Sequence, residues 1–277
     1  MNLNNIYPTA LAIAREAGAL LREGYFASGS AHKEIALKSS SMDLVTRYDK
    51  AAETLIADRL RSAFPDHRLL AEEGATNSDG DSPYLWVVDP LDGTTNFAHG
   101  FPIFAVSMAL LENGVPRLGV VYDPTRDECF SAIAGQGAWL TRADSTTEPL
   151  QVSSARTLQE SLLATGFPYD VQTSDWDNLA EFRAFLKCSR GVRRPGAAAI
   201  DLAYVAAGRF DGYWEYKLKS WDIAAGVLLV EEAGGRVTSI TNDSLILGER
   251  IHLIASNGHL HEAMAAVLAD VRSRQAK

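Results

Sequence analysis

Two aspartates directly follow a short apolar run in the first half of the chain. The run spans residues 84–88, is rich in β-branched and aromatic residues, and is followed by Asp89 and Asp92. Such a run predicts a strand, and two carboxylates at its end are suited to hard cations that take oxygen ligands. The amides of Gly93 and Thr94 could hold an anion if a turn or helix begins there. Together these residues favour metal-assisted chemistry on a phosphate.

Other acidic residues could join this pair. They are Glu72 and Glu73 before a glycine, Asp43, Asp49, Glu215 among aromatics, and Asp222 after a tryptophan. Each also has a purely structural interpretation: Asp222 and Asp49 could cap helices, and Glu73 alone is typical of a solvated surface. Asp89 with Pro90 could form a turn. The pair Asp89 and Asp92 is harder to dismiss, because sheet proteins place ligands at the carboxyl ends of strands.

Other classes of motif are poorly represented. The sequence contains no His-Glu-x-x-His zinc pattern, no Gly-x-Ser-x-Gly elbow and no Walker A loop, and Gly135-Gln136-Gly137 lacks the third glycine of a dinucleotide fingerprint. The basic stretch 190–194 is too short for a nucleic-acid patch, so a solvated loop or an interface edge is expected there. These patterns leave the acidic residues as the main candidates for chemistry.

The composition is that of a globular protein with an acidic surface. The chain has 277 residues, a formal net charge of −9 and a pI of about 5.2, which argues against non-specific binding to nucleic acid or anionic membranes. Bound divalent cations would make the local charge positive and so attract a phosphate substrate.

The cysteines and the lack of targeting segments indicate a location. Cys129 and Cys188 fit a reducing compartment. With no basic segment before an apolar stretch at the N-terminus and no membrane-length apolar run, a cytoplasmic location is expected.

The elements that must position these acids can be read from hydrophobic periodicity. An Asn-Gly pair at Asn113-Gly114 predicts a hairpin. Helices are expected over 7–25, 49–64, 177–188, 197–207, 223–233 and 260–272. Strands are expected over 84–88, 103–111, 115–122, 128–133, 138–141, 162–165, 211–216, 236–240 and 253–256. The pattern predicts one layered α/β domain over residues 1–277, in two halves with a seam near 145–160, and an exposed loop over 76–82.

Two segments resemble the signatures of the inositol monophosphatase family. They are Asp89-Pro90-Leu91-Asp92-Gly93-Thr94-Thr95-Asn96-Phe97 and Trp221-Asp222-Ile223-Ala224-Ala225-Gly226. The resemblance continues over nearly the whole chain, through 38–40, 43–46, Asp49, 72–73, 119–122, 135–138, 194–199 and Glu215. It implies a fold similar to fructose-1,6-bisphosphatase, with alternating layers in the order αβαβα, and a homodimer.

The resemblance also implies roles for individual residues. The Mg²⁺ ligands would be Glu72, Asp89, the carbonyl of Leu91, Asp92 and Asp222, holding two or three ions, with Glu73 as a less certain contributor through water. Thr94 and Asp49 would orient and deprotonate the attacking water, and Glu72 would be catalytic by holding a metal that lowers the pKa of that water. The amides of Gly93 and Thr94 would hold phosphate oxygens. Asp92, the main chain of Ala198, Glu215 and Asp222 would contact inositol hydroxyls.

The activity that follows is Mg²⁺-dependent hydrolysis of inositol monophosphate, with sensitivity to Li⁺. A histidinol-phosphate phosphatase of the same superfamily remains an alternative, because the carboxylate of Glu215 could meet an amine as well as hydroxyls. The related 3′-phosphoadenosine phosphatases typically carry a lysine after Gly-Thr, where this chain has Thr95. A regulatory binding protein that retains the fold is the alternative from a different class, and it would gain weight if a metal carboxylate were missing. All of them are present.

Overall fold

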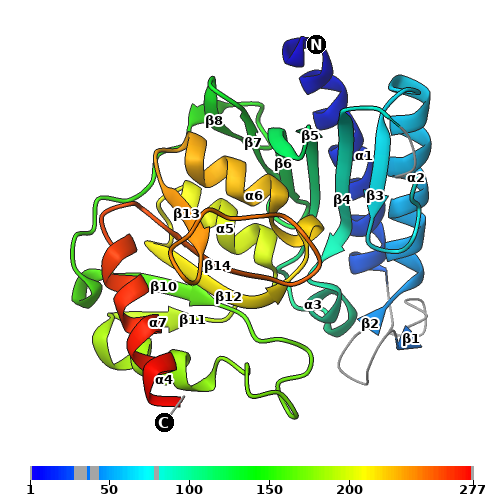
Figure 1. Ribbon diagram of the computed structural model, residues 1–277. Coiled ribbons are helices and arrows are strands. Elements are labelled where there is room, and N and C mark those ends of the chain that lie inside the picture. Colours follow the sequence, from blue (N-terminus) through cyan, green and yellow to red (C-terminus); the bar gives the residue numbers. More distant parts are fainter. Residues whose placement is uncertain (1, 28–35, 38–43, 78–80, 276–277) are drawn as a thin grey trace.

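Helical layers and sheets alternate through the molecule in the order αβαβα (Figure 1). The structure is a computed structural model that describes residues 2–27, 36–37, 44–77 and 81–275. The residues 38–43 that contribute to the family resemblance, Asp43 among them, lie outside the described residues. The layer order implied by the resemblance is confirmed.

One outer layer consists of α1 (Leu3–Phe26) and α2 (Arg47–Ala63), which pack on one face of the larger sheet (Figure 1). α1 buries Ile6, Ala10, Ile13, Ala17 and Leu21, a spacing that places them on one face of a helix. They join a core cluster with Trp86, Val88 and other alternate residues of the sheet. The amphipathic helices predicted over 7–25 and 49–64 are therefore confirmed.

The larger sheet has seven strands in sequence order. β3 and β4 are parallel, and every later neighbour is antiparallel. At the predicted hairpin, Asn113 and Gly114 both have positive φ, as a type I′ turn requires. The strands are β3 (Arg68–Ala71), β4 (Tyr84–Asp92), β5 (Ala105–Glu112), β6 (Val115–Asp123), β7 (Glu128–Ile133), β8 (Gly137–Thr141) and β9 (Thr147–Pro149).

The middle layer is formed by α5 (Ala198–Ala206) and α6 (Ser220–Glu232), which lie between the two sheets (Figure 1). Both helices are apolar on nearly all sides, as expected for helices covered by a sheet on each face. Gly226 lies against Leu202, where an added Cβ would come within 2.5 Å of the leucine Cβ. Small residues thus allow the close approach of the two helices.

The second sheet has five strands in the order β11-β10-β12-β14-β13. β10 is parallel to both of its neighbours, and the other pairs are antiparallel. The outer face of this sheet is covered by α4 (Leu179–Cys188) and α7 (His261–Gln275). The strands are β10 (Leu162–Thr165), β11 (Gly191–Arg193), β12 (Gly212–Leu218), β13 (Arg236–Ser239) and β14 (Ile251–Ser256).

Several short elements were not predicted. The stretch 190–194, expected as a solvated loop or an interface edge, contains the edge strand β11. This strand pairs with β10 through backbone hydrogen bonds that side-chain polarity does not reveal. The short helix α3 (Thr94–His99), the pair β1 (Ala36–Leu37) and β2 (Leu44–Val45), and a 3₁₀ turn at Leu158–Glu160 complete the fold. Each is too short to show a hydrophobic period.

The larger sheet ends at Pro149 and the second sheet begins at Leu162. One core cluster nevertheless includes residues of both sheets, such as Val87 and Leu253, together with α5 and α6. On this basis we propose that the two halves form one domain whose seam lies near 145–160. Within the described ranges, no helix is long and apolar enough to cross a membrane.

Candidate active site

A β-bulge turns Asp89 and Asp92 toward the same side of the larger sheet. Asp92 follows Asp89 by three positions, so in a regular strand their side chains would point to opposite faces. Asp89 pairs with Ser107 and Asp92 with Ala105, which means that β4 contains one extra residue here. The bulge includes Pro90, which has no amide to contribute to the ladder. Both carboxylates consequently face the middle helical layer.

A second bulge follows Glu215 in β12. Glu215 pairs with Leu253, whereas Leu218 pairs with Ile251, and Lys217 in between has a φ of 61°. Glu215 lies on the same face of the strand as Tyr213, which belongs to the core cluster of the middle layer. The two sheets therefore direct their acids toward each other across the layer that contains α5 and α6.

Asp92 is held by the N-terminus of α5. Its carboxylate accepts hydrogen bonds from the amide of Ala198 at 3.2 Å and from that of Ala199 at 2.7 Å. The free amides and the dipole at the start of a helix favour a negative charge. This arrangement joins β4 to Ala198, the residue predicted to contact substrate hydroxyls through its main chain.

Thr94 and Asp49 form the hydrogen-bonded pair that the resemblance implies. The Thr94 hydroxyl lies 2.9 Å from Asp49 Oδ1 and 3.0 Å from the carbonyl oxygen of Leu91. Asp49 Oδ2 accepts hydrogen bonds from the amide and the hydroxyl of Thr46, at 2.8 and 2.6 Å. Asp49 also closes a capping box at the start of α2, so its structural and proposed functional roles coexist.

Glu72 lies in the turn after β3, beside Asp89 on the parallel neighbour β4. Its amide donates to the carbonyl oxygen of Val88 at 3.2 Å, and its side chain is hydrogen-bonded to Asp89. Asp89 Oδ1 also accepts from the amide of Leu91 at 2.9 Å. Glu73 is partly buried, which differs from the solvated surface acid expected of it alone.

Asp222 approaches from α6. The helix begins at Ser220, three residues before the predicted start, so Asp222 lies within the first turn and is not the N-cap. Its Oδ2 accepts from the amide of Lys219 at 2.7 Å, the reach-back half of a capping box. The interpretation of Asp222 as an N-cap is wrong, because the N-cap is Lys219, three positions earlier. The helix start was misplaced because its apolar period begins only after the first turn.

The electrostatics of these acids are unfavourable in the metal-free protein. Burial, followed by repulsion from Glu72 and other acids, raises the pKa of Asp89 and of Asp222 well above the ordinary range. Burial also raises the pKa of Asp92 and of Glu215 to about 7. In the described part of the chain, Asp89, Asp92, Asp222 and Glu215 form no salt bridge with a basic side chain. A nearby cation would relieve this repulsion.

The donor set fits a hard cation. All candidate side chains are carboxylates, and the Leu91 carbonyl adds a further oxygen, which is the ligand chemistry of Mg²⁺. Among the described residues, however, no three His, Cys, Asp or Glu side chains already have the convergent spacing of a metal-binding group. The acids thus face the same helical layer, but their carboxylate oxygens do not converge on one common point.

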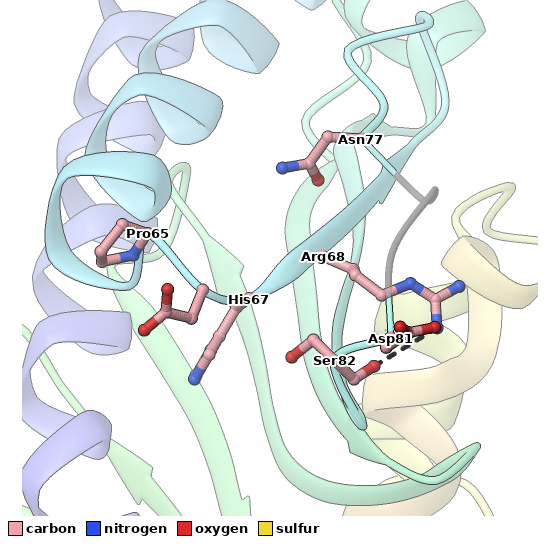
Figure 2. Close-up of a pocket in the computed structure, with 7 residues that line it drawn as sticks. Pro65, His67, Arg68, Asn77, Asp81 and Ser82 are labelled. Carbon is pink, nitrogen blue, oxygen red and sulfur yellow. Dashed lines mark hydrogen bonds between the residues drawn. The ribbon is translucent and has the colours of Figure 1, made fainter.

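A separate cavity has a volume of about 390 Å³, and Figure 2 shows the residues that line it. It is lined by Pro65, Asp66, His67, Arg68, Asn77, Asp81 and Ser82. Arg68 begins β3 and Ser82 precedes β4, whereas Glu72 and Asp89 lie toward the other ends of these parallel strands. Ligands of parallel strands usually bind at the carboxyl ends, so the acidic cluster remains the candidate site.

Asn96 and Asp201 lie near the site, although neither was given a role from the sequence. The Asn96 amide donates to the carbonyl oxygens of Ile103 and Pro195, both at 2.8 Å, and so ties the loop after β4 to the segment before α5. Asp201 is fully buried in α5, neither of its side-chain oxygens has a hydrogen-bond partner, and burial followed by repulsion from Glu215 raises its pKa. An acid in an otherwise apolar helix was the available signal for Asp201.

Known proteins resemble this chain over almost its whole length. A sequence profile of the inositol monophosphatase family matches residues 2–273. The chain is 44% identical to an inositol-1-monophosphatase from Synechocystis, over 94% of this chain and 89% of that protein. It is also 44% identical to the Nus factor SuhB of Pseudomonas aeruginosa, over 94% of each.

The same likeness extends to three dimensions. A solved structure of an inositol monophosphatase from Anabaena superposes with a TM-score of 0.84 at 42% identity, covering 98% of this chain and 97% of that one. A profile match over almost the whole chain and full-length relatives at this identity lead to one conclusion. The chain belongs to the inositol monophosphatase family.

Proposed function

We propose that this protein is a Mg²⁺-dependent phosphomonoesterase that hydrolyses inositol monophosphate to inositol and phosphate. One observation carries the proposal: the acids of both sheets face the same middle layer, beside the hydrogen-bonded pair of Thr94 and Asp49. A cluster of acids would repel a phosphate monoester unless cations intervene. The Mg²⁺ ligands in this proposal are Glu72, Asp89, the Leu91 carbonyl, Asp92 and Asp222.

Bound divalent ions would neutralise the phosphate, stabilise the departing alkoxide and acidify a water molecule. The protein's own groups then orient the reactants. Asp49 fixes the Thr94 hydroxyl through a 2.9 Å bond, and this pair would align the attacking water and accept its proton. The amides of Gly93 and Thr94, at the start of α3, would hold phosphate oxygens. Such positioning is the main protein contribution to phosphoryl transfer.

The alcohol portion of the substrate would lie between Asp92, the main chain of Ala198, Glu215 and Asp222. Tyr213 donates a short hydrogen bond to Glu215, which fixes the direction of that carboxylate. The remaining oxygen of Glu215 would accept hydroxyl groups of a polyol. An amine could take the same place, so histidinol phosphate is retained as the competing substrate. We further propose that the protein is a cytoplasmic homodimer and that Li⁺ inhibits it.

A regulatory role is a second candidate, and it rests on one finding. A full-length relative at 44% identity is named as a Nus factor, SuhB, so a chain of this family can carry a function named apart from catalysis. The candidate metal carboxylates are all present here, and for this reason we place the enzyme first. The two functions are not mutually exclusive.

The test is phosphate release from a panel of phosphomonoesters, with and without Mg²⁺. The panel contains inositol 1-phosphate, histidinol phosphate, fructose 1,6-bisphosphate and 3′-phosphoadenosine 5′-phosphate. We expect release to require Mg²⁺ and to be fastest from inositol 1-phosphate. Faster release from histidinol phosphate would transfer the function to that substrate, and no release from any of the four would favour the regulatory role.

A further inference from the structure

A buried glutamate on α2 contacts the turn that carries Glu72 and Glu73. Glu53 is 4% exposed, and its two carboxylate oxygens accept hydrogen bonds from two backbone amides of this turn. The amide of Glu73 lies 2.6 Å from Oε2, and that of Ala75 lies 2.7 Å from Oε1. Hydrogen bonds to an ionised acceptor are among the stronger ones in proteins. Glu53 therefore fastens the turn to α2 at two points.

Several other hydrogen bonds shape the turn, and the Glu72 amide also ties it to the Val88 carbonyl oxygen of β4. The Thr76 amide donates to the Gly74 carbonyl oxygen at 2.8 Å, and Gly74 has a φ of 106°. The Thr76 hydroxyl and the Asn77 amide both bond to the carbonyl oxygen of Leu69. These contacts fold the segment back on β3, but they do not set its position relative to α2, which lies beside it (Figure 1).

The position of Glu53 along α2 gives this contact its significance. Glu53 follows Asp49 by four residues, so the two buried acids lie on the same face of the helix. Asp49 bonds to Thr94, and Glu53 bonds to the turn of Glu72. One turn of α2 therefore sets the distance between two parts of the site. One part is the pair Asp49 and Thr94, proposed to align water, and the other is the loop segment with Glu72, proposed to hold a metal ion.

We propose that Glu53 is a positioning residue, which sets the turn carrying Glu72 and Glu73 at a fixed place relative to Asp49 and so prepares the site for Mg²⁺. This inference rests on the proposed metal-dependent function. Groups that orient metal ligands typically contribute a factor of about 10–100 to metal affinity. A purely structural role would instead affect stability without a specific effect on Mg²⁺.

The test compares Glu53→Gln with Glu181→Gln. Glu181 is a matched control because it is also a buried helical glutamate, 3% exposed, with a 2.9 Å bond from the Tyr216 hydroxyl, on the outer face of the second sheet. Binding of Mg²⁺ alone is measured by calorimetry, and unfolding is followed by thermal denaturation. We expect Glu53→Gln to weaken Mg²⁺ binding about tenfold or more, and Glu181→Gln to lower Tm with unchanged Mg²⁺ affinity.

Hydrogen exchange gives a second readout that does not depend on metal. The amides of Glu73 and Ala75 should exchange faster in Glu53→Gln, because a side-chain amide can offer only one acceptor oxygen to the two donors. Should Glu53→Gln fail to fold, Glu53→Asp retains the charge and shortens the reach, and weaker Mg²⁺ binding is again expected.

Unchanged Mg²⁺ affinity in the folded variant, with normal binding by the unaltered protein, would overturn this inference and leave the proposed function intact. A loss of affinity matched by Glu181→Gln would overturn it as well. Absence of Mg²⁺ binding by the unaltered protein would overturn both the proposed function and the inference.

Discussion

Buried acids occur in two different settings in this protein. Glu128 on β7 is buried between two arginines: both of its oxygens accept from Arg209 at 2.6 Å, and Oε1 also accepts from Arg142 at 2.9 Å. Burial alone would raise the pKa of Glu128, but the hydrogen bond and charge of Arg209, with further arginines, lower it. Asp92 is buried and Glu215 is partly buried, both near other acids, and the pKa of each is raised to about 7.

Glu128 therefore stabilises the fold, whereas Asp92 and Glu215 are suited to binding a ligand. A paired acid has its charge balanced by the protein itself, whereas the acids of the candidate site gain full compensation only from outside. Strongly perturbed acids gathered in one place are typical of functional sites. Fold stability is therefore expected to depend on Glu128, and cation binding and turnover on Asp92 and its neighbours.

The largest effect is expected for Asp92→Asn. Replacing one carboxylate oxygen removes the charge of a proposed ligand, while the remaining oxygen can still accept from the amides of α5. Because groups that only orient ligands contribute 10–100-fold, we expect phosphate release to fall by more than about 100-fold at saturating Mg²⁺. Steady-state kinetics test this, with circular dichroism as the control for folding. Near-normal turnover would contradict the proposed role of Asp92.

The second-largest effect is expected from removing divalent cations, which should lower the stability of the folded protein. A ligand at about 100 times its Kd stabilises the folded state by about 2.7 kcal/mol, and for a chain of this size each kcal/mol corresponds to about 2–4 °C in Tm. We expect Mg²⁺ added to protein treated with a chelator to raise Tm accordingly. The increase should persist in Glu128→Gln and shrink in Asp92→Asn. An equal increase in both variants would show that the ion binds elsewhere.

Glu128→Gln should destabilise the protein without affecting its chemistry. A hydrogen bond to a charged group contributes about 1.5–3 kcal/mol, and we expect a loss of unfolding free energy of that order. Since the folded pKa of Glu128 is lowered, its contribution is present above the ordinary value of 4.5 and is lost as the pH falls through the folded pKa. Urea denaturation at neutral and acidic pH measures the loss of unfolding free energy and its dependence on pH. A difference between the variant and the unaltered protein that grows toward acidic pH would contradict this prediction.

The smallest effect is expected for Gly166→Ala, which tests the packing beside Glu215. An added Cβ would come within 2.1 Å of Glu215 Oε2, so the carboxylate must move. We expect KM for inositol 1-phosphate to rise about tenfold, since ångström-scale misplacement near a substrate is costly. Gly248→Ala is the matched control, because a Cβ there meets no heavy atom within 4 Å. Equal kinetics for the two variants would exclude Glu215 from alcohol recognition.

Much of the fold followed from local patterns. The hairpin at Asn113-Gly114, the strands over 128–133 and 162–165 and the helix at the N-terminus were predicted because periodicity and turn residues act over a few positions. Short elements such as β11 and α3 were not, because they are stabilised by neighbours that are distant in the sequence. The start of α6 was misplaced because its apolar period begins only after the first turn.

The amino-acid sequence by itself determined which groups are available: carboxylates at strand ends, a threonine and glycine behind them, and no competing motif. Only the tertiary structure decided how they face one another. Strand pairing creates the bulge that turns Asp89 and Asp92 to one side of the larger sheet and sets the register that directs Glu215 toward the middle layer. Contacts across the fold place Glu53 and Asp201 beside the site. Register and burial depend on partners far along the chain, so spacing alone could not have revealed them.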